Sequence, residues 1–212
     1  MIHSGVWGGE ATPVFHFTHI DNLATIAAGG LQCDTRIQAT RVLQQEVGNQ
    51  DIKSMRRARE VPIPPGGVVA DYVLFYFAPR SPMMYAIHMG NVPTYVDGCD
   101  EIVYLCSALG RLRDTGSTLV LTDRNAALAH ASFASHAADL DIDWPLMGER
   151  YWNSTPEYPD RREKRMAECL AYEVVAPGAI EAVAVKSQAV ANKVTRLVGT
   201  PWPVTVSPGW YF

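Results

Sequence analysis

The chain has 212 residues, of which 48% are hydrophobic, and this fits one domain over residues 1–212 that buries its own core. Its formal net charge of −4 argues against binding of nucleic acid through a uniformly basic surface. No apolar stretch is long enough to cross a bilayer, and residues 1–5 do not begin a signal peptide. We therefore expect a cytoplasmic protein with no membrane association.

Cationic residues are nevertheless concentrated in two short clusters. They are Lys53, Arg56, Arg57 and Arg59 in the first, and Arg161, Arg162, Lys164 and Arg165 in the second. A local basic surface attracts phosphate groups even on an acidic protein, so the clusters are compatible with nucleic-acid binding. By themselves they fit two solvated helix faces at least as well.

The spacing of reactive residues excludes several common sites. The four cysteines form no CxxC pair, so we expect reduced, mostly buried thiols instead of a zinc ribbon or a disulfide scaffold. Neither the HxxH of His16 and His19 nor any other histidine spacing supplies a zinc pair with a third ligand, so we expect no metal. The sequence contains no GxGxxG after a strand and no P-loop, so a dinucleotide would have to bind by another route.

In chain order, residues 15–18 predict a short strand that leads directly into a helix. Thr18 and Asp21 have the spacing of a capping box, and apolar residues continue at helical spacing over 19–28. A pair of glycines then provides a left-handed stop for this helix.

Residues 34–60 are polar, with Leu43 and Val47 as weak helical anchors, and the proline- and glycine-rich run over 62–67 predicts a rigid turn. The remaining elements are expected as strands over 73–77, 102–106, 118–121, 168–175, 182–185 and 204–206, and as helices over 82–88, from 122 or 123 to 131, and over 187–197. Residues 132–159 are irregular and predict mostly loop. This mixed order favours an α+β fold over regular βαβ alternation.

Three polar residues at the first junction between strand and helix are candidates for a binding site. Alternation places His16 and Thr18 on one face of the strand, and Asn22 lies near a helix amino terminus, which favours anions. A histidine satisfied in the core and a capping threonine would explain the same residues without any ligand.

Glu168 is the most conspicuous carboxylate, because it begins an apolar strand directly after a basic run. An unpaired carboxylate would be costly to bury at such a junction. Glu168 therefore either forms a structural ion pair with Arg162 or Arg165, or faces a positive charge that develops during a reaction.

Aromatic side chains over residues 72–77 predict core packing and a stacking wall. Farther along, Arg80 lies near Met83 and Tyr85, a combination that can contact unstacked bases.

Taken together, several segments resemble the DarT family of DNA ADP-ribosyltransferase toxins. The resemblance extends from about residue 12 to residue 206 and is carried by residues 15–23, 29–31, 61–67, 71–83 and 164–168. It implies an ADP-ribosyltransferase fold related to the PARP-type enzymes, with a split, mostly antiparallel β core, flanking helices and NAD+ in the cleft.

The resemblance also implies a function and two partners. A toxin of this kind transfers ADP-ribose from NAD+ to a base in single-stranded DNA, thymine in the branch that this sequence resembles most, sequence-specifically and reversibly. Its implied partners are single-stranded DNA and a cognate antitoxin, DarG, whose macrodomain removes the mark and which can bind the toxin.

Carried over residue by residue, the resemblance assigns roles to the candidates. His16 and Thr18 would hold the nicotinamide end of NAD+, with Asn22 near the same site, and Glu168 would be the catalytic glutamate. Arg56 best matches the family's catalytic arginine and would also contact NAD+. The adjacent Arg57 is a rival for this role. The family often has two neighbouring arginines soon after Ile-Lys, whereas this chain reads Ile-Lys-Ser-Met-Arg-Arg.

The residues expected to contact nucleic acid are Arg80, Met83, Tyr85, Arg162 and Arg165. The competing hypotheses are ADP-ribosylation of another base, of RNA or of a protein, NAD+ hydrolysis alone, and a non-catalytic nucleic-acid binding module on the same fold. The presence of both His16 and Glu168 argues against the last of these, since a binding module needs neither residue.

Overall fold

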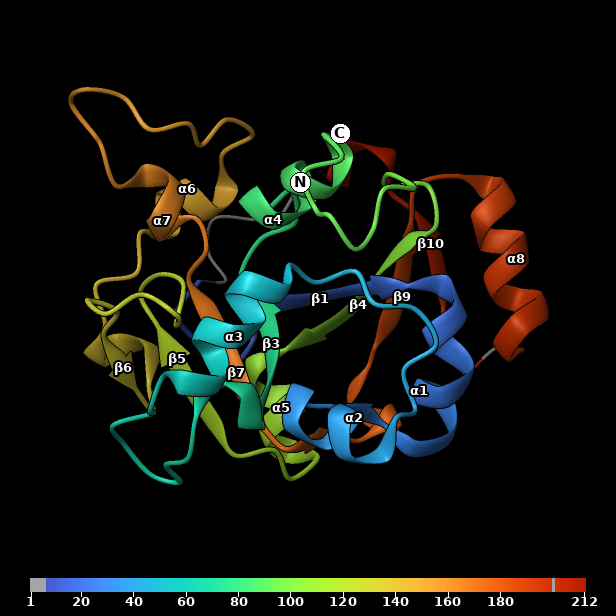
Figure 1. The fold of residues 1–212 in the computed structure, drawn as a ribbon, viewed down its shortest axis with the longest axis horizontal. Coiled ribbons are helices and arrows are strands. Elements are labelled where there is room, and N and C mark those ends of the chain that lie inside the picture. Colours follow the sequence, from blue (N-terminus) through green and yellow to red (C-terminus); the bar gives the residue numbers. More distant parts are fainter. Residues whose placement is uncertain (1–6, 200) are drawn as a thin grey trace.

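The computed structural model describes residues 7–199 and 201–212, and the expectation about residues 1–5 lies outside them (Figure 1). Its centre is an eight-stranded sheet with the strand order β10-β9-β4-β1-β3-β7-β5-β6. These strands are β1 (Pro13–His19), β3 (Tyr72–Tyr76), β4 (Ile102–Ala108), β5 (Leu119–Thr122), β6 (Phe133–Ala134), β7 (Glu168–Tyr172), β9 (Ala182–Val185) and β10 (Val204–Val206). Strands β9 and β10 pair in parallel and the other neighbours pair antiparallel, which confirms the mostly antiparallel α+β core.

Helices and a small second sheet surround this core. The α-helices are α1 (Leu23–Gly29), α2 (Asp34–Thr40), α3 (Gln50–Ala58), α4 (Pro82–His88), α5 (Leu109–Asp114), α6 (Trp144–Gly148), α7 (Arg161–Lys164) and α8 (Gln188–Val198). The 3-10 helices are η1 (Ile20–Asn22), η2 (Val69–Asp71), η3 (Ala137–Asp139), η4 (Pro177–Ala179) and η5 (Pro208–Trp210). The second sheet pairs β2 (Leu31–Gln32) with β8 (Val174–Val175). In Figure 1, α3 crosses in front of β3 and β7, so it can place side chains over these strands.

The large sheet is split between β1 and β3. These strands share a single registered pair, Phe15 with Tyr76, whereas β1 pairs with β4 along its whole length from Pro13 to His19. In the gap, the His16 side chain bonds the carbonyl of Leu74 on β3, with 2.7 Å between Nδ1 and the oxygen. The split therefore gives a polar side chain access to strand backbone that a continuous ladder would occupy.

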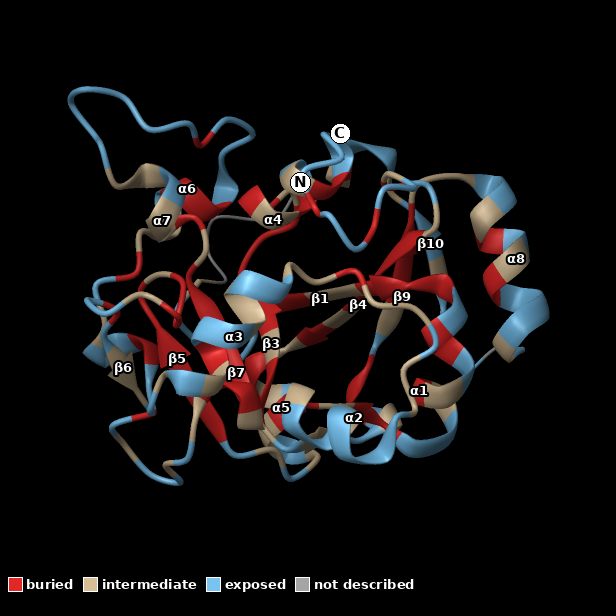
Figure 2. Ribbon diagram, viewed as in Figure 1, coloured by how far each residue is buried: buried red, intermediate tan, exposed pale blue. Residues whose placement is uncertain are grey.

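The hydrophobic core covers one face of the sheet continuously and the other face in two parts. On the continuous face, α1, α5 and α8 contribute Leu23, Leu112 and Val194, and each such fully buried side chain stabilises the fold by about 1.5–3 kcal/mol. On the opposite face, one cluster surrounds Tyr104 and a separate one surrounds Leu170. Figure 2 shows buried residues along the strands and exposed ones on the outer sides of α2 and α8.

Several elements match the sequence predictions closely. Helix α4 has the predicted bounds, because Ser81 accepts a hydrogen bond from the Met84 N–H and Pro82 occupies the first turn. The first helix ends as expected, since Gly30 takes a φ of 84°. The strand predicted over 168–175 is interrupted at Glu173, whose φ of 57° separates β7 from β8.

Other local predictions are wrong because side chains bond in ways that spacing does not show. His19, not Thr18, caps the first helix, since its Nδ1 accepts the N–H of Asp21 at 3.2 Å. Leu43 and Val47 anchor no helix and lie in the connection between α2 and α3.

The helix expected from 122 or 123 to 131 is also wrong, because turns replace it. Asn125 accepts the N–H of Ala127, and Asp123 accepts the N–H of Ser132 at 2.9 Å. These side chains satisfy backbone groups locally and so compete with a helical ladder.

Candidate active site

Glu168 forms a buried ion pair that neither sequence alternative anticipated. It opens β7, where its register partners are Tyr76 on β3 and Thr122 on β5, and its side chain is 1% exposed. Nη1 of Arg56, on the last turn of α3, donates to Oε1 at 3.1 Å and to Oε2 at 2.9 Å. The expected structural partners, Arg162 and Arg165, do not pair with it. An arginine bonded to both carboxylate oxygens favours the ionised form and fixes the side chain in a single orientation.

The neighbouring arginine, Arg57, points elsewhere. Its guanidinium bonds Asp34, with Nε at 2.9 Å and Nη2 at 2.8 Å, and its side chain is 36% exposed. Arg56 is buried, and among the described residues its Nη2 has no hydrogen-bond partner. An unpartnered buried donor beside a carboxylate can donate a hydrogen bond to an acceptor on a bound molecule. The geometry therefore favours Arg56 over Arg57 as the functional arginine.

The pKa of Glu168 is raised above the ordinary glutamate value, because burial outweighs the opposing effect of Arg56. Transfer that needs the ionised carboxylate is expected to fall as the pH decreases through this raised pKa. The folded protein binds the proton more tightly than the unfolded chain, so protonation adds stability at low pH, and this contribution is lost as the pH rises through the folded-state pKa. Rate and melting temperature should therefore respond to pH in opposite directions around this group. Parallel pH profiles of the wild type and Glu168→Gln would check this, and an unshifted melting profile in the variant would contradict it.

His16 lies across the sheet split from Glu168. A carbonyl can only accept, so the bond to Leu74 means that Nδ1 carries the proton and Nε2 is an acceptor. Burial lowers the pKa of His16 to about 4, the hydrogen bond to Leu74 opposes this, and the charge of Lys53 adds to it. The imidazole is therefore neutral at physiological pH and offers an acceptor without repelling a cationic ligand.

This state of His16 can be measured by ring-nitrogen NMR, which should report the Nδ1–H tautomer and a titration near pH 4. Because the unfolded chain binds the proton more readily, the His16 contribution to stability should decline as the pH falls from about 6.5 toward 4. A titration midpoint near 6.5 would contradict the burial argument.

Thr18 and Asn22 take different positions. Thr18 lines the main cavity, and its hydroxyl accepts a hydrogen bond from Nδ2 of Asn22 at 3.0 Å. The Asn22 amide also donates to the Gln45 carbonyl at 2.8 Å, and its oxygen accepts the N–H groups of Gln44 and Gln45. Asn22 is thus occupied in holding the connection between α2 and α3, so its contribution to ligand binding would be indirect.

The cavity has a volume of about 180 Å³, and residues of all three apolar clusters contribute to its lining. His16, Thr18, Arg56 and Glu168 all line it, so the structure brings four predicted site residues together. A smaller cavity of about 70 Å³ shares His16 and Thr18 with it and reaches Asn22. Two adjoining cavities with mostly apolar walls and a few polar side chains are typical of a site for a small organic ligand.

Sequence reasoning missed some residues of this cavity. Tyr76 lies beside Glu168 in the ladder, and burial together with the Glu168 charge raises its pKa, so its phenol stays protonated. Asn125 and Lys53 also line the cavity. Strand alternation could have separated Tyr76 from the core residues Phe75 and Phe77, but the loop position of Asn125 leaves no such signal.

Two residues predicted to bind nucleic acid are engaged within the protein. Arg80 donates through Nη1 to the Tyr211 carbonyl, and its guanidinium lies 3.9 Å from the centre of the Phe212 ring. Arg165 is 3% exposed, and its Nη atoms bond the carbonyls of Leu146, Met147, Glu149 and Pro79. This placement does not favour the predicted DNA contact for Arg165, because its guanidinium is buried and anchors loops.

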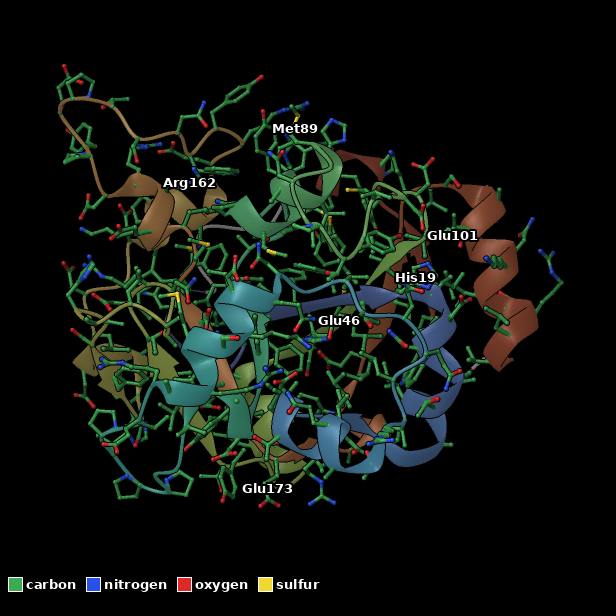
Figure 3. All side chains as sticks on the ribbon, viewed as in Figure 1. His19, Glu46, Met89, Glu101, Arg162 and Glu173 are labelled. Atoms are coloured by element: carbon green, nitrogen blue, oxygen red, sulfur yellow. The ribbon has the colours of Figure 1, made fainter. Side chains whose placement is uncertain are left out.

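The other predicted nucleic-acid residues remain available. Met83 lines the cavity, Tyr85 is 40% exposed on α4, and Arg162 is exposed on α7, where Figure 3 shows it toward the edge of the molecule. Within the described residues, no group of three His, Cys, Asp or Glu side chains could hold a metal ion. Over the same part of the chain, no helix is both long and apolar enough to cross a membrane.

A buried carboxylate fixed by an arginine at a cavity, opposite a neutral imidazole in a split antiparallel sheet, is an arrangement that can stabilise positive charge developing on a bound sugar. Comparison with known proteins gives the family. A sequence model described as "ssDNA thymidine ADP-ribosyltransferase, DarT" matches residues 15–212. The chain is 37% identical to a DNA ADP-ribosyl transferase of Thermus sp. strain 2.9, over 96% of this chain and 97% of the relative. It is 33% identical to a DNA ADP-ribosyl transferase of Mycobacterium tuberculosis, over 94% of this chain and 88% of the relative.

Solved structures agree with the sequence comparison. Thermus sp. 2.9 DarT in complex with ADP-ribosylated ssDNA superposes with a TM-score of 0.86 at 36% identity, covering 95% of this chain and 96% of that one. The same enzyme in complex with NAD+ gives a TM-score of 0.83 and covers 96% and 99% of the two chains. The protein therefore belongs to the DarT family of single-stranded DNA thymidine ADP-ribosyltransferases, as the sequence segments indicated.

Proposed function

We propose that this protein transfers ADP-ribose from NAD+ to thymine in single-stranded DNA, sequence-specifically and reversibly. The observation that carries the proposal is the buried Arg56–Glu168 pair at a cavity shared with His16 and Thr18. NAD+ binding in the Thermus relative supports the co-substrate, and ADP-ribosylated ssDNA in the same enzyme supports the acceptor.

In the proposed reaction, the bond between nicotinamide and ribose breaks and nicotinamide leaves with the electron pair. The Glu168 carboxylate stabilises the resulting oxocarbenium-like ribose by charge and by accepting hydrogen bonds from its hydroxyls. The thymine ring nitrogen attacks the anomeric carbon and loses its proton as the new bond forms. Arginine is a poor base, so Arg56 orients Glu168 and the substrates while Glu168 assists the proton transfer.

His16 and Thr18 are proposed to hold the nicotinamide end of NAD+. The acceptor at Nε2 of His16 and the Thr18 hydroxyl can bond polar hydrogens of the ligand, and the neutral state of His16 avoids repulsion of the nicotinamide cation. Asn22 supports this wall through its hydrogen bond to Thr18.

The DNA strand is proposed to pass Met83, Tyr85 and Arg162. Replacement of Tyr85 by alanine removes one stacking surface, worth about 1–3 kcal/mol per base, so KM for the oligonucleotide should rise by roughly tenfold with little change in KM for NAD+. Leu197→Ala removes an equally exposed apolar side chain on α8, away from α4 in Figure 1, and should leave both constants unchanged. An unchanged oligonucleotide KM in Tyr85→Ala would remove this residue from the DNA path.

Mass spectrometry of oligonucleotides incubated with the protein and NAD+ tests the proposed function directly. The expected product carries one added ADP-ribose on thymine-containing single strands only. Labelling of thymine-free DNA or of RNA, or release of nicotinamide without any labelled strand, would contradict it.

A reversing partner is part of the proposal. A curated relative from Thermosipho africanus is a fusion of DNA ADP-ribosyl transferase with DNA ADP-ribosyl glycohydrolase, and this chain covers 49% of that relative at 24% identity. We propose that a DarG-like macrodomain antitoxin removes the mark made by this protein, which would then act as the toxin. Because NAD+ and DNA occur together inside cells, a cytoplasmic location belongs to the same proposal.

A further inference from the structure

Lys53 is a cavity-lining cation with no role in the mechanism above. It lies on α3, one turn before Arg56, and its side chain is 19% exposed. Its ammonium group contacts Oδ1 of Asp34 at 2.8 Å and also bonds Oε2 of Glu46. All three residues line the main cavity, so the pairing takes place on its wall.

The charges of this wall are unfavourable for an anion as they stand. Among the described residues that line the cavity, the carboxylates are Asp34, Glu46 and Glu168, and the cations are Lys53 and Arg56. Nη1 of Arg56 bonds both carboxylate oxygens of Glu168, so the charge of this arginine is largely balanced by that carboxylate. The diphosphate of a dinucleotide adds two negative charges, so its binding is favoured where a cation is released from its carboxylate to meet it.

Lys53 bonds two carboxylates, and of these Asp34 is held in place by a further partner. It also bonds Arg57, and although burial opposes its ionisation, the bonds with Lys53 and Arg57 keep its pKa below the ordinary value. Glu46 has a single cationic partner within the described part of the chain, and its side chain is 29% exposed. Its remaining bond within the protein is to the N–H of Gly48, accepted by Oε1 at 2.6 Å.

The backbone beside Glu46 is held in place, although the Glu46 side chain can give up its bond to Lys53. Asn22 bonds the N–H groups of Gln44 and Gln45 and the Gln45 carbonyl, so the chain just before Glu46 is anchored to η1. Figure 3 shows Glu46 near the middle of the view beside β1, far from the peripheral Glu173. Release of Lys53 therefore requires rotation of one side chain and no movement of the loop.

We propose that Lys53 binds the diphosphate of NAD+, and that Glu46 is an internal competitor that occupies Lys53 until the diphosphate displaces it. This inference rests on NAD+ being the co-substrate. Asp34 remains on Lys53 and orients the ammonium group toward the ligand. The affinity for NAD+ then depends on how much more strongly Lys53 binds the diphosphate than it binds the Glu46 carboxylate.

Titration calorimetry with NAD+ on four forms of the full-length protein tests this inference: wild type, Lys53→Gln, Glu46→Gln and the double variant. Lys53→Gln should raise Kd roughly tenfold to a hundredfold, the usual range for a lost charge-assisted hydrogen bond. Glu46→Gln should lower Kd severalfold. In the double variant the gain from Glu46→Gln should disappear, because the competition acts only through Lys53.

Two controls distinguish a lost ligand contact from a damaged fold. Lys186→Gln breaks a comparable ion pair, with Asp100, at a position that does not line the cavity, and it should bind NAD+ like the wild type. Lys53→Arg keeps the charge and should keep most of the affinity for NAD+. A higher affinity in Lys53→Arg than in Lys53→Gln excludes a purely structural effect.

Two results would overturn the inference: an unchanged Kd in Lys53→Gln, or a gain from Glu46→Gln that persists when Lys53 is absent. Either result leaves the proposed function intact as long as the wild type binds NAD+ and labels thymine. Failure of the wild type to bind NAD+ would instead contradict the proposed function itself.

Discussion

Replacement of Glu168 by glutamine is expected to lower ADP-ribose transfer by about 100-fold or more, the scale seen when one group that stabilises transition-state charge is removed. Glutamine keeps the shape of the side chain and loses the negative charge, so the cationic ribose has no counterion. Binding of NAD+ should persist, because the ground state carries no charge at that ribose carbon. Transfer is measured as labelled oligonucleotide under saturating NAD+, and binding is measured by calorimetry.

The buried position of Glu168 requires a check on stability. The substitution leaves the Arg56 guanidinium without its carboxylate, and breaking such a buried pair costs about 3–5 kcal/mol. Thermal unfolding therefore has to show that the variant is folded at the assay temperature. Glu173→Gln is the matched control, since this glutamate is exposed and pairs with Arg36 at the surface. Near-normal labelling by folded Glu168→Gln would refute the catalytic assignment.

Replacement of Arg56 by glutamine is expected to reduce transfer by a similar factor, about 100-fold, for a second reason. Arg56 is the cation that opposes the effect of burial on Glu168. Without it the pKa of Glu168 rises further, and a protonated acid cannot stabilise a cation. The same change also removes Nη2, a buried donor that has no hydrogen-bond partner among the described residues.

Arg57→Gln is the natural control for this variant, because the two arginines are adjacent and carry the same charge. Its partner Asp34 keeps a second cation, Lys53, and a partly exposed pair is worth about 0–1 kcal/mol, so transfer should stay within about threefold of the wild type. The pH profile adds a second readout, since partial recovery of Arg56→Gln at high pH would follow ionisation of Glu168. If Arg57→Gln proves the more damaging change, the geometric choice of Arg56 is wrong.

The sequence predicted helix ends correctly where a capping residue, a proline or a glycine at the end itself sets the boundary. The proline and serine at the start of α4 place its amino terminus, and Gly30 ends α1 with a positive φ. Prediction failed over residues 122–131, where Asp123 and Asn125 bond nearby backbone groups and replace a helix by turns. Short polar side chains suit either outcome, so spacing alone does not separate them.

The roles of the basic residues could not be predicted because they depend on distant partners. Arg165 stood in a basic run that suggested a DNA contact, yet its guanidinium is enclosed by carbonyls of the 146–149 segment and of Pro79. Asn22 stood among the ligand candidates, yet its amide anchors Gln44 and Gln45. In both cases the partners are contributed by segments that are remote in sequence.

The sequence by itself determined which residue types were available for chemistry and the family segments that contain them: a histidine on a strand, a glutamate at the start of another, and two arginines on a helix. The tertiary structure alone decided how they combine. Arg56 and Glu168 are 112 positions apart, and adjacent helical residues point in different directions, so only packing of α3 over β7 selects Arg56 for Glu168 and leaves Arg57 for Asp34. The same packing places Lys53 between Asp34 and Glu46, because residues one turn apart on α3 face the same cavity.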